Sequence, residues 1–249
     1  MFRSIYASGT AMLTQERRLD VISNNIANAN TTGFKEDEMI SRSFRDELIS
    51  RLDETTMVNK VREVGPYNHG IHVDQVVTDF RGGTPISTDN YTDAAIEGDG
   101  FFVFNTPQGE RYSRNGVFRV TNDGVLVNQD DFPLQGENGD ITVGAGSFTI
   151  NRVGEIYNNE GELIDRIRLV SFDDNSLLRK EGNNLYYNTD ANMQESTASI
   201  RQGYIEASNV DGVTAMVEMI KTYRNYETNQ RVIQSVDAIA AKTVELGRV

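Results

Sequence analysis

Two segments with the periodicity of amphipathic helices stand at opposite ends of the chain, and they constrain its fold more than any other feature. In the first segment, Ile5, Met12, Leu19 and Ile26 recur every seven residues, and Phe2, Leu13 and Ile22 widen the stripe. The matching stripe of the last segment consists of Val213, Met216, Ile220, Tyr223, Ile233, Val236, Ala240 and Val244. The simplest way to bury both stripes is to pair the helices along a coiled-coil-like seam. One such pair leaves part of each stripe exposed, and we expect neighbouring copies of the chain to cover that part.

The chain between these segments, from about residue 70 to residue 202, has the character of a β domain. Short runs of β-branched and aromatic residues alternate there with tight-turn signals, which is typical of antiparallel sheets. The sequence therefore predicts an α+β fold in which long N- and C-terminal amphipathic helices flank a mainly antiparallel β central domain. The clearest turn signals are Asn115-Gly116, Asp123-Gly124 and the triplet Asn159-Glu160-Gly161.

These patterns divide the chain into four segments. Residues 1–35 form the N-terminal helix and residues 206–249 the C-terminal helix. Residues 70–205 form the β domain. Residues 36–69 are charged and partly helical in character, and we interpret them as a connector or surface extension.

The charge of the chain is strongly negative and unevenly distributed. Of the formal net charge of −13, residues 1–35 contribute +2 and residues 206–249 contribute −1, so the middle carries −14. This balance argues against nucleic acid or an anionic membrane as the main partner, and it lets the near-neutral ends pack against copies of themselves. No apolar run approaches about 18 residues, so we expect no membrane span. The N-terminus also lacks the apolar core of a cleaved signal peptide.

Two stretches contain residue types that bind metal ions. His69 and His72 lie near Asp74, but Gly70 favours a loop that enters a strand, so ordinary polar roles are favoured. Residues 121–131 are rich in oxygen ligands but lack the spaced acidic residues and the terminal Glu of a calcium loop. We therefore expect no metal site.

Enzymatic chemistry finds little support in the sequence. With 37 acidic residues, chance pairs of carboxylates are inevitable, and nothing singles out a pair at the spacing that a glycosidase needs. There is no G-x-S-x-G motif, phosphate loop or dinucleotide fingerprint. The chain has no cysteine, which excludes thiolate catalysis and disulfides. We expect no catalytic residue and no cofactor.

Four asparagines stand within seven residues at the end of the first helical segment: Asn24, Asn25, Asn28 and Asn30. Asparagine is poor inside helices but favours caps and turns, and its amide donates and accepts hydrogen bonds without carrying charge. The cluster, with Gly33 as a natural stop, suits polar contact with a partner helix or a neighbouring subunit. The alternative is a frayed cap with solvated amides. Candidates for the N-cap of the last helix are Ser208, Asn209 and Asp211.

Three stretches together resemble one protein family. "LDVISNNIANANTTGFK" (19–35) is similar to the N-terminal signature of bacterial flagellar axial proteins of the rod and hook class. "IEGDGFFVFNTPQGERYSRNGVFRVTNDGVLVN" (96–128) resembles the central block of that family, and "EASNVDGVTAMVEMIKTYRNYETNQRVI" (206–233) resembles its C-terminal block. The three stretches occur in the family's order. One departure is Tyr223, which stands where the family usually has Gln.

The resemblance implies a structural subunit of the flagellar basal-body rod, of the distal or proximal type, and not an enzyme. In that family the terminal helices form an inner coiled-coil tube and the β-rich middle forms an outer layer. The implied partners are copies of the chain in a helical homo-assembly that transmits torque, other flagellar rod and hook proteins, and the flagellar type III export apparatus. The implied location is the basal body, outside the cytoplasm, reached without a cleaved signal peptide.

The resemblance also indicates which residues of the terminal segments lie at subunit interfaces. In the N-terminal segment these are Ile5, Met12, Leu19, Ile22, Asn24, Asn25, Ile26, Asn28, Asn30, Gly33 and Phe34. In the C-terminal segment they are Ser208, Asn209, Val210, Asp211, Met216, Met219, Ile220, Tyr223, Arg224, Tyr226, Glu227, Asn229 and Ile233. Two other functions stay open at this point: a secreted glycan hydrolase that acts on the cell wall, and a coiled-coil surface adhesin.

Overall fold

The computed structural model describes residues 2–51, 62–144 and 146–247, and the chain forms two compact units. Each unit is assembled from segments that lie far apart in the sequence. Unit 1 comprises Met1–Ile26, Asp37–Val77 and Gly212–Val249, and unit 2 comprises Ala27–Glu36 and Thr78–Asp211.

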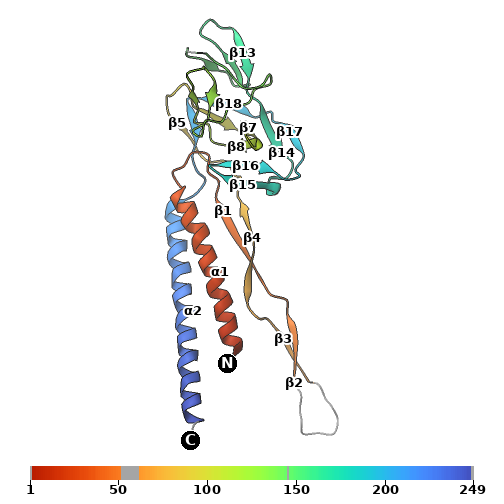
Figure 1. Ribbon diagram of the computed structural model, residues 1–249, viewed down its shortest axis with the longest axis vertical. Coiled ribbons are helices and arrows are strands. Elements are labelled where there is room, and N and C mark those ends of the chain that lie inside the picture. The colour runs from red at the N-terminus through yellow and green to blue at the C-terminus, as the bar shows by residue number, and fades with distance from the viewer. Residues whose placement is uncertain (1, 52–61, 145, 248–249) are drawn as a thin grey trace. The chain divides into compact units, whose positions relative to one another are not determined.

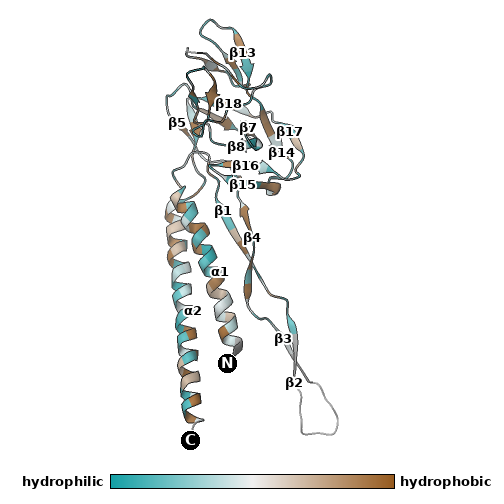
Figure 2. Cartoon of the chain, in the orientation of Figure 1, coloured by the Kyte–Doolittle hydropathy of each residue, from teal (hydrophilic) through white to brown (hydrophobic). Residues whose placement is uncertain are grey.

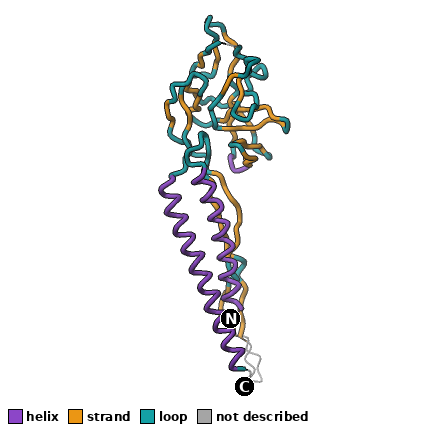
Figure 3. The backbone as a smooth tube through the Cα atoms, turned by 60° about the vertical axis from the view of Figure 1, so that its left-hand side comes forward, coloured by secondary structure: helices purple, strands orange, loops and turns teal. Residues whose placement is uncertain are grey.

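The two helices of unit 1 are the elements predicted at the chain ends. Helix α1 spans Phe2–Ala27 and helix α2 spans Gly212–Leu246. They lie side by side, with the first turns of α2 beside the last turns of α1 (Figures 1 and 3). The two helices and the antiparallel sheets confirm the α+β class. A coiled-coil pairing of the helices stays a prediction.

Helix α1 ends at Ala27, six residues before the glycine that was expected to stop it. The backbone carbonyl of Asn28 accepts a hydrogen bond from the Thr31 N–H at 3.0 Å, and the Asn28 side chain accepts one from the Thr31 hydroxyl at 3.2 Å. These bonds form a turn that competes with further helix, because asparagine offers the backbone local partners. Gly33 therefore has another role, described below.

The charged segment 36–69 contains strands and not the partial helix that we expected. Strands β1 (Asp37–Ser43) and β4 (Ile71–Thr78) pair with each other, and β2 (Glu47–Arg51) pairs with β3 (Arg62–Tyr67). In β1 Met39 is buried while its neighbours Glu38 and Ile40 are exposed, and this alternation of burial suits a strand with one covered face. The part of this segment at 52–61 lies outside the described residues.

Unit 2 is built around a six-stranded sheet of order β15-β16-β8-β7-β14-β17, and the strand pairs described within the unit are antiparallel. Smaller pairings flank this sheet, namely β18 with β6, β19 with β5, β10 with β9, and β11-β12-β13. The elements are β5 (Pro85–Ser87), β6 (Ala94–Glu97), β7 (Phe101–Thr106), β8 (Gly109–Ser113), β9 (Arg119–Val120), β10 (Leu126–Val127), β11 (Thr149–Ile150), β12 (Glu155–Tyr157), β13 (Leu163–Arg166), β14 (Leu169–Phe172), a single 3-10 turn η1 (Asn175–Leu177), β15 (Leu178–Gly182), β16 (Leu185–Asn188), β17 (Met193–Glu195), β18 (Ser199–Gln202) and β19 (Tyr204–Glu206).

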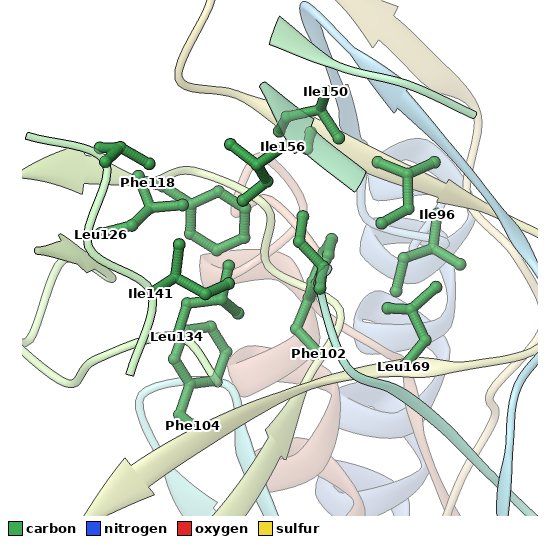
Figure 4. Packing of buried hydrophobic residues seen from close by; sticks show 14 of the residues in the cluster. Ile96, Phe102, Phe104, Phe118, Leu126, Leu134, Ile141, Ile150, Ile156 and Leu169 are labelled. Atoms are coloured by element: carbon green, nitrogen blue, oxygen red, sulfur yellow. The ribbon is translucent and has the colours of Figure 1, made fainter. Parts of the chain in front are cut away.

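The hydrophobic core of unit 2 is closed. Phe102, Phe104, Leu126 and Leu134 are completely buried, and aliphatic side chains from β11, β12 and β14 pack on them (Figure 4). The alternate residues of β7 serve a second cluster on the other face of the sheet, where Phe101 packs with aromatic neighbours. A strand that buries both of its faces reads as the continuous apolar run "FFVF".

One five-residue turn recurs four times in unit 2, at 121–125, 128–132, 151–155 and 158–162. In each turn the N–H of the fourth residue donates to the carbonyl of the first residue. The side-chain oxygen of the first residue, Thr or Asn, accepts a hydrogen bond from the N–H of the fifth residue. The fourth residue has positive φ in all four turns. Two of these turns confirm the predicted signals at Asp123-Gly124 and at 159–161.

Candidate functional site

The three stretches that resemble one family meet inside unit 2. The Gly33 N–H donates to the backbone carbonyl of Glu206 at 2.8 Å, which joins the first stretch to the last. The Thr32 hydroxyl donates to the side chain of Asn115 at 2.8 Å, which joins the first stretch to the central one. We call the cluster formed by Gly33, Lys35, Arg114, Asn115, Glu206 and Asn209 the junction.

A buried ion pair lies at the centre of the junction. The Lys35 ammonium lies 2.5 Å from Oε1 of Glu206, and both side chains are buried. The ammonium also donates to the backbone carbonyl of Arg81 at 2.8 Å. Burial lowers the pKa of Lys35 below its ordinary value, and the charge of Glu206 opposes that shift. Removing one partner of such a pair leaves the other as an uncompensated charge in a poorly solvated place.

Arg114 adds a second buried cation on the other side of the Glu206 carboxylate. Its Nη1 lies 3.4 Å from Oε2 of Glu206, and its Nη2 donates to the Gly98 carbonyl at 2.8 Å. The guanidinium also lies over the Phe101 ring, 5.3 Å from its centroid. Oε1 of Glu206 additionally accepts a hydrogen bond from the Gly83 N–H at 2.8 Å. The carboxylate therefore binds groups from three separate segments, at Lys35, Gly83 and Arg114.

Two glycines allow the backbones of the junction to approach each other. A Cβ at Gly33 would lie 2.5 Å from the Asn115 nitrogen, and Gly33 has a φ of +68°. A Cβ at Gly116 would lie 1.6 Å from the Ala94 carbonyl oxygen. Gly116 does not have positive φ, so the expectation of a left-handed turn at Asn115-Gly116 is wrong. Close backbone approach requires both glycines.

Asn209 ties together three segments through which the chain leaves unit 2. Its side-chain oxygen accepts a hydrogen bond from the Glu36 N–H at 2.7 Å, and its side-chain nitrogen donates to the Asp79 carbonyl at 2.9 Å. The Asp79 N–H in turn donates to the Glu36 carbonyl at 2.8 Å. The segments that continue into β1, β4 and α2 are thus held by one amide.

The other asparagines of the predicted cluster occupy different environments. Asn25 is buried, and its amide bonds the backbone of Asp37 twice, donating to the carbonyl at 2.8 Å and accepting from the N–H at 3.0 Å. This amide therefore holds the first residue of β1 against α1. Asn24 and Asn30 are exposed, and Asn28 closes the turn after the helix. Their expected contacts with a neighbouring subunit stay a prediction.

The three residues predicted as candidate N-caps of α2 also lie in different environments. Asp211 directly precedes the first helical residue. The Ser208 hydroxyl accepts a hydrogen bond from the Val210 N–H at 3.2 Å, and Val210 is buried. Asn209 belongs to the junction and not to a helix cap.

The predicted apolar residues of α1 whose burial is described are at least partly covered, except Leu13, which is 64% exposed and not buried in the stripe as expected. Ile22 is buried, and Ile5, Met12, Leu19 and Ile26 are partly buried. Phe34, which lies beyond the helix, is buried under the Lys180 ammonium, 4.1 Å from the centroid of its ring.

The first half of helix α2 covers a different face from the predicted stripe, whereas Ile233, Val236 and Ala240 of that stripe are partly buried and Val244 is exposed. The buried residues of α2 are Ala215 and Thr222, and the partly buried residues continue this line at spacings of four and three. This covered seam consists of Ala215, Met219, Thr222, Tyr226, Asn229, Ile233, Val236 and Ala240. The pattern of large apolar residues did not predict this seam, because the seam includes threonine, asparagine and alanine. Of the remaining predicted contacts, Glu227 is partly buried and Arg224 is exposed.

The first half of the predicted stripe on α2 is exposed. Hydrophobic residues, coloured brown, occur along both helices (Figure 2). The exposed stripe of α2, which we call the α2 stripe, consists of Val213 (74% exposed), Met216 (54%), Val217 (46%), Ile220 (54%) and Tyr223 (54%). The expected burial of these residues within the chain is absent from the structure, because the helix turns its small and polar seam inward.

The histidines lie at the bend of the paired strands in unit 1. His69 Nε2 lies 3.0 Å from Oε2 of Glu47, and the His69 ring packs edge-on against Tyr6 and Tyr67. His72 stacks on Phe44. Within residues 2–51, 62–144 and 146–247, no group of three acidic or histidine side chains could hold a metal ion, and neither helix could span a membrane.

The sequence analysis missed the junction. Lys35, Arg114 and Glu206 all stand within the family-like stretches but were not singled out. Only Gly33, Asn115 and Asn209 were, each for another reason. No local signal marks these three charges, because Arg114 precedes an asparagine but Lys35 and Glu206 have neither glycine nor asparagine as a direct neighbour. Nothing in the sequence says which charges pair across 171 residues.

Comparisons with known proteins agree with the three stretches. The family model "Flagella basal body rod protein" matches residues 5–35, "Flagellar hook protein FlgE/F/G D1 domain" matches residues 95–158, and "Flagellar basal body rod FlgEFG protein C-terminal" matches residues 201–246. The chain is 34% identical to the flagellar basal-body rod protein FlgF of Caulobacter vibrioides over the full length of both chains. It is 32% identical, again over the full length of both chains, to the flagellar hook-basal body complex protein FlhO and to the rod protein FlgG, both of Bacillus subtilis.

Proposed function

Because the chain belongs to the flagellar basal-body rod protein family, it is a structural subunit of the basal body and not an enzyme, and we propose that it polymerises helically through α1 and α2 to transmit torque. The alternative of a glycan hydrolase is therefore wrong. The proposal extends to contacts of the terminal segments with other rod and hook proteins. It also includes passage through the flagellar type III export apparatus without a cleaved signal peptide, to a place outside the cytoplasm.

The observation that carries the polymerisation proposal is the contrast between a closed core in unit 2 and the exposed α2 stripe. Monomeric proteins rarely expose contiguous apolar surface of this kind, because each such side chain gains free energy when it leaves water. Residues 206–249 have a net charge of only −1, so copies of α2 meet little repulsion. The acidic middle of the chain, by contrast, favours a solvated outer layer.

The junction supports the torque proposal. A subunit that transmits torque needs firm attachment of the segments that lead into its assembling helices. In unit 2, the Lys35–Glu206 pair and the Asn209 amide bind those segments to the sheet and to one another. Ion pairs and hydrogen bonds that join distant segments in this way favour one arrangement of the backbone.

A deletion strain tests the proposal. We expect cells without this gene to stop swimming, and we expect the wild-type gene on a plasmid to restore swimming and return the protein to purified hook-basal bodies. Val153→Asp, which changes an exposed side chain of unit 2, serves as a control and should also restore swimming. Normal swimming of the deletion strain, or absence of the protein from basal bodies of swimming cells, would reject the proposal.

A further inference from the structure

The α2 stripe has a counterpart on the other helix of the same chain. On α1, Tyr6 and Leu13 are 57% and 64% exposed and stand seven residues apart, so they share one face. Gly9 lies between them, and a Cβ added there would meet no atom within 4 Å. This α1 patch, made of Tyr6, Gly9 and Leu13, presents two large side chains on either side of an open position.

The patch and the stripe lie at different heights along the helices of one chain. The first turn of α2 lies beside the last turn of α1 (Figures 1 and 3). With a rise of 1.5 Å per residue, Leu13 lies about 21 Å and Tyr6 about 31 Å from the end of α1 at Ala27. Met216 lies about 6 Å and Tyr223 about 16 Å from the start of α2 at Gly212. The two surfaces are therefore exposed together, and neither can cover the other within one chain.

A shift of about 15 Å along the helices brings the two surfaces into register. Leu13 then lies level with Met216, Gly9 with Ile220, and Tyr6 with Tyr223. The spacings match because the three positions on each helix are separated by four and three residues. The side chain of Ile220 then lies level with Gly9, which has no side chain. A single shift satisfies all three pairs, which is the property of a continuous seam.

We propose that the α2 stripe docks on the α1 patch of a second copy of this chain, and that this second copy is displaced by about 15 Å along the helices towards the C-terminal end of α1. We assign the docking partner as a second copy of this chain because the surface of α2 beside the stripe is nearly neutral, so two copies repel each other little. In α2, Glu218 and Glu227 balance Lys221 and Arg224 beside the stripe. A strongly basic partner would be drawn instead to the acidic middle of the chain.

The displaced contact is heterologous, because one copy contributes α2 and the next contributes α1. Contacts of this type do not close in pairs and so generate open helical assemblies. The inference rests on the proposed polymerisation and adds the residues and the stagger of one of its contacts.

Cysteine crosslinking tests the register, since the natural chain contains no cysteine and gives no background. The full-length double variants Leu13→Cys/Met216→Cys and Tyr6→Cys/Tyr223→Cys replace the wild-type protein in the deletion strain. After mild oxidation of purified hook-basal bodies, we expect both variants to form disulfide-linked dimers and larger multimers on non-reducing gels. The control Leu13→Cys/Tyr223→Cys, out of register by about 10 Å, should form none.

The outcomes separate the inference from the proposed function. Each single-cysteine variant should give no dimer, whereas dimers from Met216→Cys alone would show a symmetric contact and overturn the inference. Double variants that swim but do not crosslink would also overturn it, leaving the proposed function intact and pointing to another rod protein as the occupant. A deletion strain that swims normally would reject the proposed function itself.

Discussion

The two units of this protein differ in where they keep their large apolar side chains. Unit 2 encloses Phe102, Phe104 and Leu134 completely, whereas unit 1 leaves Val213 and Ile220 more than half exposed. A domain gains its stability from apolar surface removed from water. Unit 2 therefore buries its own apolar surface, whereas unit 1 leaves apolar surface that an assembly can bury.

The largest expected effect comes from truncating one apolar residue in each unit. Phe102→Ala should lower the free energy of unfolding of unit 2 by about 3–5 kcal/mol, because it leaves a cavity in a closed core. Ile220→Ala should change the stability of the monomer by less than about 0.5 kcal/mol, since the side chain is exposed. Urea titration followed by tyrosine fluorescence measures both. A large loss with Ile220→Ala would show that its stripe is already buried in the monomer.

The buried ion pair of the junction should respond almost as strongly. Lys35→Met leaves the buried Glu206 carboxylate with only the Gly83 N–H and the longer contact to Arg114, and we expect a loss of about 3–5 kcal/mol in the free energy of unfolding of unit 2. The matched control is Glu97→Gln, which breaks the half-exposed pair with Arg201 and should cost less than about 1 kcal/mol. Equal effects of the two variants would contradict a special role for the junction.

The amide of Asn209 should contribute less than the ion pair. Asn209→Ala leaves the Glu36 N–H and the Asp79 carbonyl without this partner, which should cost about 1–3 kcal/mol. Hydrogen exchange of the Glu36 amide should accelerate at the same time. Gln194→Ala, which removes an exposed hydrogen bond to Asp173, is the control and should leave that exchange unchanged. Unchanged exchange in Asn209→Ala would mean that other contacts hold the segments.

The smallest effects are expected when one glycine in each unit is replaced by alanine. Gly161 has a φ of +80° with free space around it, so Gly161→Ala should destabilise unit 2 by about 1 kcal/mol through backbone strain alone. Gly9 lies inside α1 with no atom near its added Cβ, so Gly9→Ala should stabilise the helix by about 0.5–1 kcal/mol. Thermal unfolding followed by circular dichroism gives both signs. Destabilisation by Gly9→Ala would show that the α1 patch is already covered.

Local patterns in the sequence were sufficient to predict both helices, the antiparallel class of the sheets and the turn at Asp123-Gly124. Each depends on residues that are neighbours in the chain, because helix period and turn conformation are set over a few residues. The same reasoning failed for residues 36–69, where charged residues suggested partial helix but β1 pairs with β4, a strand some 30 residues away.

The junction and the faces of α2 were decided only by the tertiary structure. Lys35 and Glu206 stand 171 residues apart, and nothing local states that one will neutralise the other. The covered seam of α2 contains Thr222 and Asn229, which a hydropathy pattern assigns to solvent. Burial of such residues depends on the elements that pack against them, whereas the sequence by itself determines only what each side chain can offer to such a contact.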